Sequence, residues 1–339
     1  MATTIGWDIG GAHLKAALVK DGEVLAVEQL ACPLWLGVDH LADAWQTVSA
    51  KFGAPGRHAV TMTGELAEIF PSREEGVRAI CHAAGQLVGD TAIRFYAGPL
   101  GFVAQEAAIA NWERVASANW HASAAWIGRQ VAEALLIDVG STTTDIIPIA
   151  SGVPVARGYS DAERLETGEL VYTGVLRTSL MALANEAPFA GRRQRLMAEN
   201  FATTADIYRL TGQLAPEDDS YPASDGRGKS AEECRARIAR MFGRDASAAS
   251  DAGWNSAAGY FRERQLQLIG EGVAQLRSAG HISASAPFVA AGAGHFLVTE
   301  MARRFGHPIT HFAEHVPTRD SVRRKAGMCA PAVAVALLV

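Results

Sequence analysis

The sequence predicts a two-domain α/β protein whose ligand lies in a cleft between the domains. Three observations lead to this prediction. The chain has 339 residues, which is long for one compact domain. Hydrophobic residues make up 49% of it, enough for a sizeable core. A strand–turn–strand unit near the N-terminus recurs from residue 134, so the second half starts in the same way as the first.

The first half is expected to alternate strands with helices after a strand-rich start, as is typical of layered α/β folds. Its expected strands are residues 3–11, 14–19, 23–32, 58–63 and 93–96. Its expected helices are residues 40–52, 74–88 and a long stretch over 105–130.

The second half repeats the strand-rich start and then becomes mostly helical over residues 162–276. Its expected strands are residues 134–137, 144–149, 153–159, 287–291 and 309–312, and its closing helices are 295–305 and 327–338. The polar segment 213–229 is expected to be a loop within the second domain. We therefore expect residues 1–124 with 310–339 to form one domain, and residues 125–309 the other with a helical insertion.

The charge and hydropathy patterns disfavour nucleic acid and membranes as partners. The formal net charge is -5 and Lys and Arg form no long block, which argues against nucleic acid. The longest apolar run, residues 331–339, is too short to span a membrane, and the N-terminus has no signal-peptide pattern. The four cysteines are far apart and form no metal or redox pair. These features predict a cytoplasmic protein, and they are compatible with a homo-oligomer.

The repeated hairpin carries most of the functional prediction. In each copy an apolar strand ends in Asp-x-Gly and turns tightly into a second strand: Asp8 and Gly10 in one, Asp138 and Gly140 in the other. A carboxylate there is costly to bury unless it is paired or bound to a metal. Turn N–H groups bind phosphate oxygens, and a carboxylate holds Mg²⁺. An Asp that merely caps its own turn is the alternative, but the repetition favours a polyphosphate held between two domains.

The predicted ligand contacts follow from this interpretation. Asp8 and Asp138 are the expected magnesium ligands. The expected phosphate-binding residues are Gly10, Gly11, Ala12, His13, Gly140, Ser141, Thr142 and Thr143. A strand leading into Gly292 and Gly294 predicts a third, nucleotide-like turn. Leu297 stands where a dinucleotide fingerprint requires its third glycine, which disfavours a Rossmann domain.

These ordered motifs resemble the phosphate-1, phosphate-2 and adenosine motifs of the acetate-kinase, sugar-kinase, chaperone-ATPase and actin superfamily. The resemblance implies the two-domain actin-like (RNase H-like) ATPase superfold with a central interdomain cleft. The run from Asp138 to Asp145 is similar to the hydantoinase and oxoprolinase branch. The whole chain resembles the proteins of the tetrahydromethanopterin-linked one-carbon transfer pathway, chiefly through residues 6–15, 63–67, 118–122 and 225–229.

That family contains the methanofuran-biosynthesis condensing enzyme, and the resemblance implies its reaction. An aminomethylfuran-methyl diphosphate and the phenol of γ-glutamyltyramine, a phenolic amine, are joined as an ether while diphosphate is released. Mg²⁺ is the implied cofactor, and ATP is not expected to be required. Many kinases of the superfold have a hydroxyl residue where Ala12 stands, which suits a site that holds a leaving group. An ATP-dependent small-molecule kinase and a nucleotide-binding sensor or chaperone-like module remain as alternatives.

Further residues are expected at the substrate end of the cleft. The expected catalytic residues are Asp8, Glu65 and Lys15. Lys15 is expected to add positive charge, and Glu65 is expected either to accept the phenol proton or to be a solvent-facing turn carboxylate. The expected cleft residues are Arg73, Asn119, Trp120, Asp145, Arg227 and Lys229. For four of them a plainer interpretation stands beside this one: core packing for Trp120, a solvated loop for Arg227 and Lys229, and a surface charge for Arg73, which is otherwise expected to bind phosphate.

Overall fold

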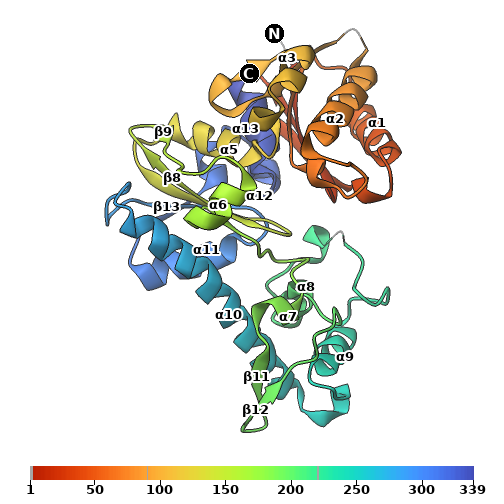
Figure 1. Ribbon diagram of the computed structural model, residues 1–339, viewed down its shortest axis with the longest axis vertical. Coiled ribbons are helices and arrows are strands. Elements are labelled where there is room, and N and C mark those ends of the chain that lie inside the picture. The colour runs from red at the N-terminus through yellow and green to blue at the C-terminus, as the bar shows by residue number, and fades with distance from the viewer. Residues whose placement is uncertain (1–2, 90, 220) are drawn as a thin grey trace.

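The computed structural model describes residues 3–89, 91–219 and 221–339, which form two β-sheets and a helical lobe (Figure 1). The first sheet has the order β3-β2-β1-β4-β5-β6. Its strands are β1 (Thr3–Ile9), β2 (His13–Lys20), β3 (Glu23–Ala31), β4 (Arg57–Met62), β5 (Ala92–Tyr96) and β6 (Phe102–Val103). Helices α1 (Asp39–Phe52) and α2 (Arg73–Val88) pack beside this sheet.

The second sheet repeats the pairing of the first. Its strands are β7 (Ala134–Val139), β8 (Thr144–Ala150), β9 (Val153–Pro154), β10 (Leu170–Val171), β13 (Phe288–Ala291) and β14 (Ile309–His311). β7 is antiparallel to β8 and parallel to β13, just as β1 is antiparallel to β2 and parallel to β4. Because the two hairpins have the same environment, their turns lie at equivalent edges of the two sheets.

Two helices, α5 (Asn119–Gly128) and α13 (Ala330–Leu338), join the sheets. α13 contacts β1, β2 and β4 of the first sheet and α5, while α5 contacts β7, β8 and β9 of the second. One buried hydrophobic cluster contains side chains of both sheets and both helices, among them Val27, Trp120, Leu136 and Val333. This shared core places the two hairpin turns on either side of one cavity.

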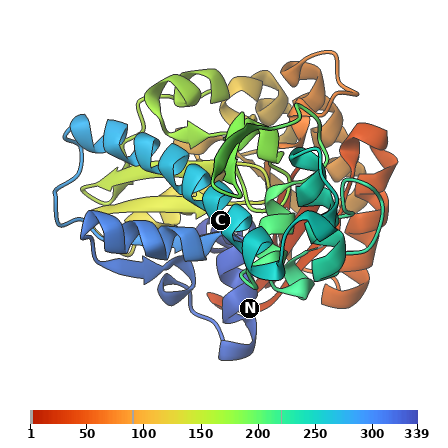
Figure 2. The same ribbon diagram turned by 90° about the horizontal axis from the view of Figure 1, so that it is seen from below.

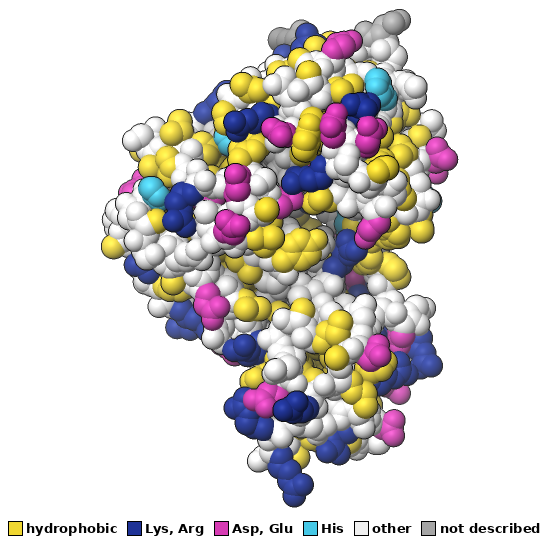
Figure 3. Space-filling model, viewed as in Figure 1, with side chains coloured by type: hydrophobic (Ala, Val, Ile, Leu, Met, Phe, Trp, Pro, Cys, Tyr) yellow, Lys and Arg dark blue, Asp and Glu magenta, His cyan; other side chains and the backbone are white. Residues whose placement is uncertain are grey.

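The helical lobe lies below the sheets in Figure 1. It is built from α7 (Leu180–Leu183), α8 (Thr204–Leu210), α9 (Ala231–Met241), the hairpin β11 (Glu186–Phe189) and β12 (Arg192–Arg195), and one end of α10 (Asp251–Ser278). α10 continues from the lobe to the second sheet, where it lies beside α11 (His295–Phe305) (Figures 1 and 2). Figure 3 shows the indentation that separates the lobe from the rest of the molecule.

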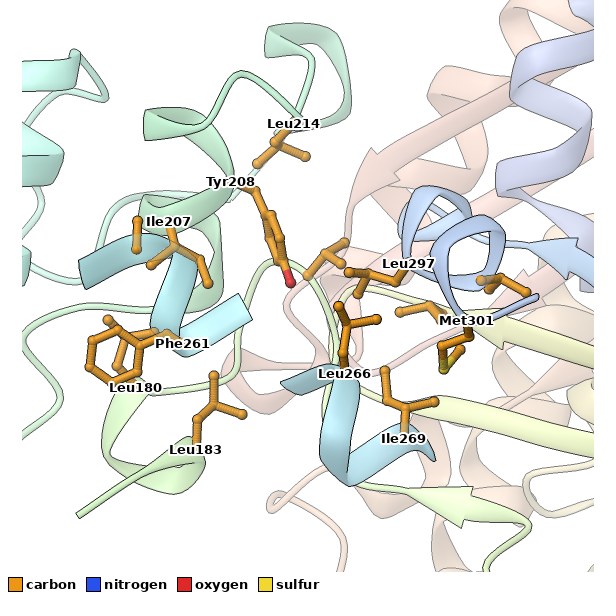
Figure 4. Close-up of a cluster of buried hydrophobic side chains, with 14 of the residues drawn as sticks. Leu180, Leu183, Ile207, Tyr208, Leu214, Phe261, Leu266, Ile269, Leu297 and Met301 are labelled. Atoms are coloured by element: carbon orange, nitrogen blue, oxygen red, sulfur yellow. The ribbon is translucent and has the colours of Figure 1, made fainter. Parts of the chain in front are cut away.

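The lobe shares a hydrophobic core with the second half. Phe261 and Leu266 of α10, Ile207 of α8 and Met301 of α11 belong to one buried hydrophobic cluster (Figure 4). No helix in the described residues is both long and apolar enough to cross a membrane.

The remaining helices are α3 (Gln105–Ala110), α4 (Trp112–Val115), α6 (Asp161–Thr167) and α12 (Asp320–Met328). Short 3-10 turns occur at Leu34–Leu36, Gly64–Leu66, Gly98–Leu100, Pro216–Asp218, Ala246–Ala248 and Phe312–His315.

Several predicted elements differ from those observed. The helix predicted over 105–130 is three helices, because Asn111 and Ser117 leave the helical conformation, the latter with φ 51°. The helix predicted over 327–338 is divided at Cys329, whose φ is -112°. The stretch 162–276 contains three short strands as well as helices, and β11 and β12 are joined through Ala190 and Gly191, both with positive φ. The described residues of the polar segment 213–229 form a loop with one 3-10 turn, as predicted.

Candidate active site

A cavity of about 250 Å³ lies between the two hairpin turns. In the first turn the N–H of Gly10 donates to the carbonyl of His13, and in the second the N–H of Gly140 donates to the carbonyl of Thr143, both at 2.9 Å. Gly174 packs under the second turn so closely that a Cβ there would lie 2.4 Å from the backbone of Ser141. The two turns therefore share the same hydrogen bond, and the second is closely packed from below.

Every residue predicted from the hairpins lines this cavity, and so does Asn119. They are Asp8, Gly10, Gly11, Ala12, His13, Lys15, Asn119, Asp138, Gly140, Ser141, Thr142, Thr143 and Asp145. The predicted residues outside its lining are Glu65, Arg73, Trp120, Arg227, Lys229, Gly292 and Gly294. Residues 8–15 and 138–145 therefore line one cavity. The other predicted residues, apart from Asn119, lie outside its lining.

Asp8 and Lys15 face each other across the first hairpin. They are paired residues of β1 and β2, and Lys15 Nζ lies 3.5 Å from Asp8 Oδ2. Burial raises the pKa of Asp8, against the opposing effect of the Lys15 charge. Burial alone would lower the pKa of Lys15, but the charges of Asp8 and Asp138 and the hydrogen bond with Asp8 raise it overall. Lys15 therefore remains a cation in the cavity wall.

The second hairpin carries two carboxylates in one paired position. Asp138 and Asp145 are opposite each other in β7 and β8. Burial, with the nearby charges of Asp145 and Asp8, raises the pKa of Asp138 to about 7 although Lys15 opposes it. Asp145 accepts a hydrogen bond from Arg164 at 2.8 Å. The cavity thus concentrates negative charge against few cations, which suits a bound cation.

The residues present fit a magnesium ion. Asp8 Oδ1 is buried and has no hydrogen-bond partner, so this carboxylate oxygen is available to coordinate a cation. The described residues contain no group of three or more His, Cys, Asp or Glu side chains placed to hold a metal. Mg²⁺ usually keeps several waters and binds one or two carboxylates together with substrate phosphates. Asp8 and Asp138 both line the cavity and would be the carboxylates to hold it.

Trp120 lies in the core between the sheets rather than in the cavity lining. Its ring stacks under the guanidinium of Arg164, with the central carbon 4.3 Å from the ring centroid. Arg164 in turn lines the cavity with only 1% of its side chain exposed. Trp120 therefore supports a cleft residue and does not contact the cleft directly.

The Gly292 turn packs against the second hairpin. Gly292 has φ 79°, and a Cβ there would lie 2.3 Å from Asp138 Oδ1. The N–H of Gly294 donates to the carbonyl of Val139 at 2.8 Å. These glycines allow the third turn to approach β7 closely, and they lie behind the carboxylate of Asp138 instead of facing the cavity.

Arg227 and Lys229 belong to the helical lobe. Lys229 Nζ lies 3.1 Å from Asp219 Oδ1, and Arg227 is exposed. The buried Arg237 donates to Asp225 and to the carbonyl of Gly228, which holds this loop in place. The loop 225–229 is therefore an internally bonded part of the lobe, outside the lining of the cavity.

Glu65 and Arg73 lie behind the cavity wall. Glu65 is 1% exposed, and its Oε1 accepts hydrogen bonds from Ser117 and Arg73. A Cβ at Gly76 of α2 would lie 2.4 Å from the Glu65 carbonyl, so the helix backbone holds Glu65 tightly. Ser117, which does line the cavity, separates Glu65 from it.

Sequence reasoning missed several lining residues. They are Trp35, Leu66, Glu68, Ser117, Asp161, Arg164, Tyr172 and Arg177, with Thr63, Ala67, Leu170 and Pro331. One signal was available, because Ser160 and Glu163 form a capping box that marks the start of α6 beside Asp161. The other positions depend on how the two halves face each other.

Two matching phosphate-type turns across one cavity define a protein of the actin-like and sugar-kinase class. Two solved structures share this fold. One is a nucleotide-free acetone carboxylase, with TM-score 0.55 and 10% identity, covering 87% of this chain and 66% of that one. The other is a ROK family glucokinase from Streptomyces griseus in complex with glucose and AMPPNP, with TM-score 0.50 and 15% identity, covering 98% of both chains.

Within this class the chain belongs to the hydantoinase/oxoprolinase family, whose model matches residues 57–337. It is 32% identical over 270 residues to the (4-{4-[2-(gamma-L-glutamylamino)ethyl]phenoxymethyl}furan-2-yl)methanamine synthase of Methanocaldococcus jannaschii, covering 79% of this chain and 80% of that protein. A protein of the same name from Methanococcus vannielii is 36% identical over 129 residues, which is 38% of this chain and 58% of the relative. The fold class and the family resemblance are both confirmed.

Proposed function

We propose that this protein is a Mg²⁺-dependent alkyl transferase of methanofuran biosynthesis. It joins an aminomethylfuran-methyl diphosphate to the phenol of γ-glutamyltyramine and releases diphosphate. The observation that carries the proposal is the 32% identity, over 79% of the chain, to a synthase whose named product contains a phenoxymethyl-furan ether. The polar cavity between two phosphate-type turns supports it, because a diphosphate is a ligand of the right chemistry for such turns.

The diphosphate end of the cavity is formed by the two turns and two cations. Lys15 pairs with Asp8, and its charge also interacts with that of Asp138. Arg177 is anchored beside the second turn, where its backbone N–H donates to the Ser141 carbonyl at 3.0 Å. The Arg177 guanidinium is exposed and lies 5.0 Å from the ring of Tyr221 and 5.5 Å from that of Trp35. Within the described residues it forms no ion pair. It is therefore available to an anionic substrate.

The cavity wall also offers apolar contacts to aromatic rings. Trp35, Leu66 and Tyr172 line the cavity, and Leu66 and Tyr172 are respectively 50% and 65% exposed. Exposed large apolar side chains around a polar pocket are typical of a binding surface for a partly apolar ligand. A furan and a phenol ring are such ligands.

The bond changes follow from these placements. The bond between the furan methylene and the diphosphate oxygen breaks, and its electron pair leaves with the diphosphate. The phenol oxygen forms the new bond to the methylene, and its proton passes to a carboxylate. A Mg²⁺ ion held by Asp8 and Asp138 would neutralise part of the negative charge on the leaving diphosphate. The turns and Lys15 bind and orient the diphosphate, so that departure needs little rearrangement of the protein.

Reconstitution tests the proposal. Purified protein is mixed with Mg²⁺, the furan diphosphate and γ-glutamyltyramine, with or without ATP. Ether and free diphosphate should form in equal amounts in both samples, and an acceptor without the phenol hydroxyl should give no ether. Asp8→Asn should lower the rate by roughly ten- to a few-hundred-fold, as expected for loss of charge-assisted contacts of about 1.5–3 kcal/mol.

The matched control is Asp43→Asn, an exposed aspartate of α1, which should keep the full rate. A strict requirement for ATP, with ADP accumulating, would contradict the proposal and favour a kinase. Full activity of Asp8→Asn would show that this carboxylate only shapes its turn.

A further inference from the structure

Four polar side chains meet at the wall of the cavity, and the mechanism above uses none of them. Glu65, Arg73 and Ser117 come from the first half of the chain, and Asp161 is the first residue of α6 in the second. Ser117 Oγ lies 2.7 Å from Glu65 Oε1 and 3.2 Å from Asp161 Oδ2. Arg73 Nη2 lies 3.2 Å from Glu65 Oε1, 3.0 Å from Ser117 Oγ and 3.4 Å from Asp161 Oδ2.

The position of Ser117 is imposed by the backbone. Its φ of 51° lies in the left-handed region, which is uncommon for a residue other than glycine and occurs often at functional sites. A serine hydroxyl has one proton, so it donates to Glu65 or to Asp161 but not to both at once. Ser117 therefore links the two carboxylates through one exchangeable hydrogen.

The two carboxylates differ in access. Glu65 has no exposed side-chain surface and its Oε2 has no hydrogen-bond partner. Burial raises its pKa, although the Ser117 hydrogen bond and the Arg73 charge oppose this. The Asp161 side chain is 20% exposed and lines the cavity together with Ser117. A substrate in the cavity can reach Asp161 and cannot reach Glu65.

The remaining carboxylates of the cavity have other surroundings. Asp8 is paired with Lys15, and Asp145 with the buried Arg164. Asp138 lies at the second turn, against the close-packed Gly292. Glu68 lines the cavity too but is exposed and, within the described residues, joins no hydrogen-bonded cluster. Asp161 is thus distinguished by its link to a second, buried carboxylate.

On the basis of the proposed function, we propose that Asp161 is the general base that accepts the proton of the phenol acceptor. As the phenol oxygen bonds to the furan methylene, its O–H proton passes to Asp161 Oδ, and the electron pair of the broken C–O bond leaves with the diphosphate. The proton is returned to solvent when the products leave. No oxidant or other co-reactant is needed.

Glu65, Ser117 and Arg73 are positioning residues in this scheme. Ser117 and Arg73 hold the Asp161 carboxylate, and Glu65 orients both of them from behind. Because Asp161 belongs to the second half and the other three to the first, the base is correctly placed only when the two halves meet as observed.

Acceptors of different acidity test this assignment. An unperturbed phenol has a pKa of about 10, so γ-glutamyltyramine must lose its proton during the reaction. A ring-fluorinated analogue that is already ionised at the assay pH needs no base. Asp161→Asn should reduce kcat with γ-glutamyltyramine by about 10²–10⁴-fold, the usual contribution of a general base. With the ionised analogue the same variant should stay within about tenfold of the wild type.

Control variants separate the possible outcomes. Glu68→Gln, from the same cavity wall, should show no such dependence on acceptor acidity. Glu65→Gln should lose less than Asp161→Asn with the ordinary phenol, and should also be largely rescued by the ionised one. Equal loss with both acceptors for Asp161→Asn, or a greater loss for Glu65→Gln, would overturn the assignment. Urea unfolding midpoints show whether each variant is folded, and a wild type that forms no ether with either acceptor would instead refute the proposed function.

Discussion

At the residue scale, the buried pair of Arg164 and Asp145 shows how charge is accommodated beside the cavity. Both side chains are largely buried, with 1% and 15% exposed. Arg164 Nη2 donates to Asp145 Oδ1 and to the Glu169 carbonyl, and the guanidinium stacks on Trp120. A buried ion pair contributes little net stability, but removal of one partner leaves an uncompensated charge. This pair therefore fixes the arrangement of α6 against β8. Removing either partner is expected to destabilise the folded protein, because the other charge stays buried.

Arg164→Gln should destabilise the protein by roughly 3–5 kcal/mol, because Asp145 would be left buried without its cation. Adding Asp145→Asn should recover part of this loss, since the double variant buries no charge. Urea unfolding of the two single variants and the double variant measures the coupling. Arg303→Gln, which removes an exposed arginine from a surface pair with Glu300, should change the unfolding free energy little. Strictly additive effects of the Arg164 and Asp145 substitutions would contradict the prediction.

At the element scale, the contact between α13 and β1 holds the first hairpin in place. α13 lies across β1, β2 and β4, and its residues from Ala330 to Ala336 are buried. Gly6 of β1 permits this close approach, because a Cβ there would lie 2.1 Å from the Ala332 carbonyl oxygen. A strand and a helix separated by more than 300 residues therefore determine where Asp8 is presented.

Gly6→Ala should destabilise the protein by about 1–3 kcal/mol, because the new methyl group meets helix backbone that has no room to move. Thermal or urea unfolding measures the change. The matched control is Gly259→Ala in α10, where nothing lies within 4 Å of the new Cβ. That substitution should be neutral or stabilising by up to about 1 kcal/mol, since alanine favours helix. Equal effects at the two positions would mean that α13 does not pack tightly on β1.

At the scale of the whole molecule, buried histidines make stability depend on pH. Burial lowers the pKa of both His58 and His121 to about 4. His58 Nδ1 accepts a hydrogen bond from Trp7 Nε1 at 2.9 Å, so the folded protein requires a neutral ring there. In the unfolded chain a histidine has a pKa of about 6.5. Between these values the unfolded chain binds protons that the folded protein does not, so stability falls as the pH decreases from 6.5 to 4.

His58→Asn should weaken this dependence, because the amide oxygen still accepts the Trp7 hydrogen bond but does not titrate. The unfolding free energy is measured in urea at several values between pH 7 and pH 4.5. The comparison with the variant is needed because the raised pKa values of Asp8 and Asp138 act in the opposite sense, giving stability that is lost as pH rises. Identical slopes for the two proteins would mean that His58 does not contribute.

The sequence by itself determined the two hairpins, their turns and the fold class. These features are local: an apolar strand, Asp-x-Gly and a second strand within about a dozen residues specify the turn that lines the cavity. The same locality explains why the repetition could be recognised, and why all 12 site residues predicted from the hairpins line one cavity.

The tertiary structure alone decided which of the more distant polar residues reach the ligand. Glu65 and Asp161 are 96 residues apart, and only the meeting of the two halves makes one buried and the other accessible. Lys229 has the charge of a phosphate ligand, but the fold of the lobe pairs it with Asp219. Burial and pairing are properties of packing between segments far apart in the chain, so neither local pattern nor charge predicts them.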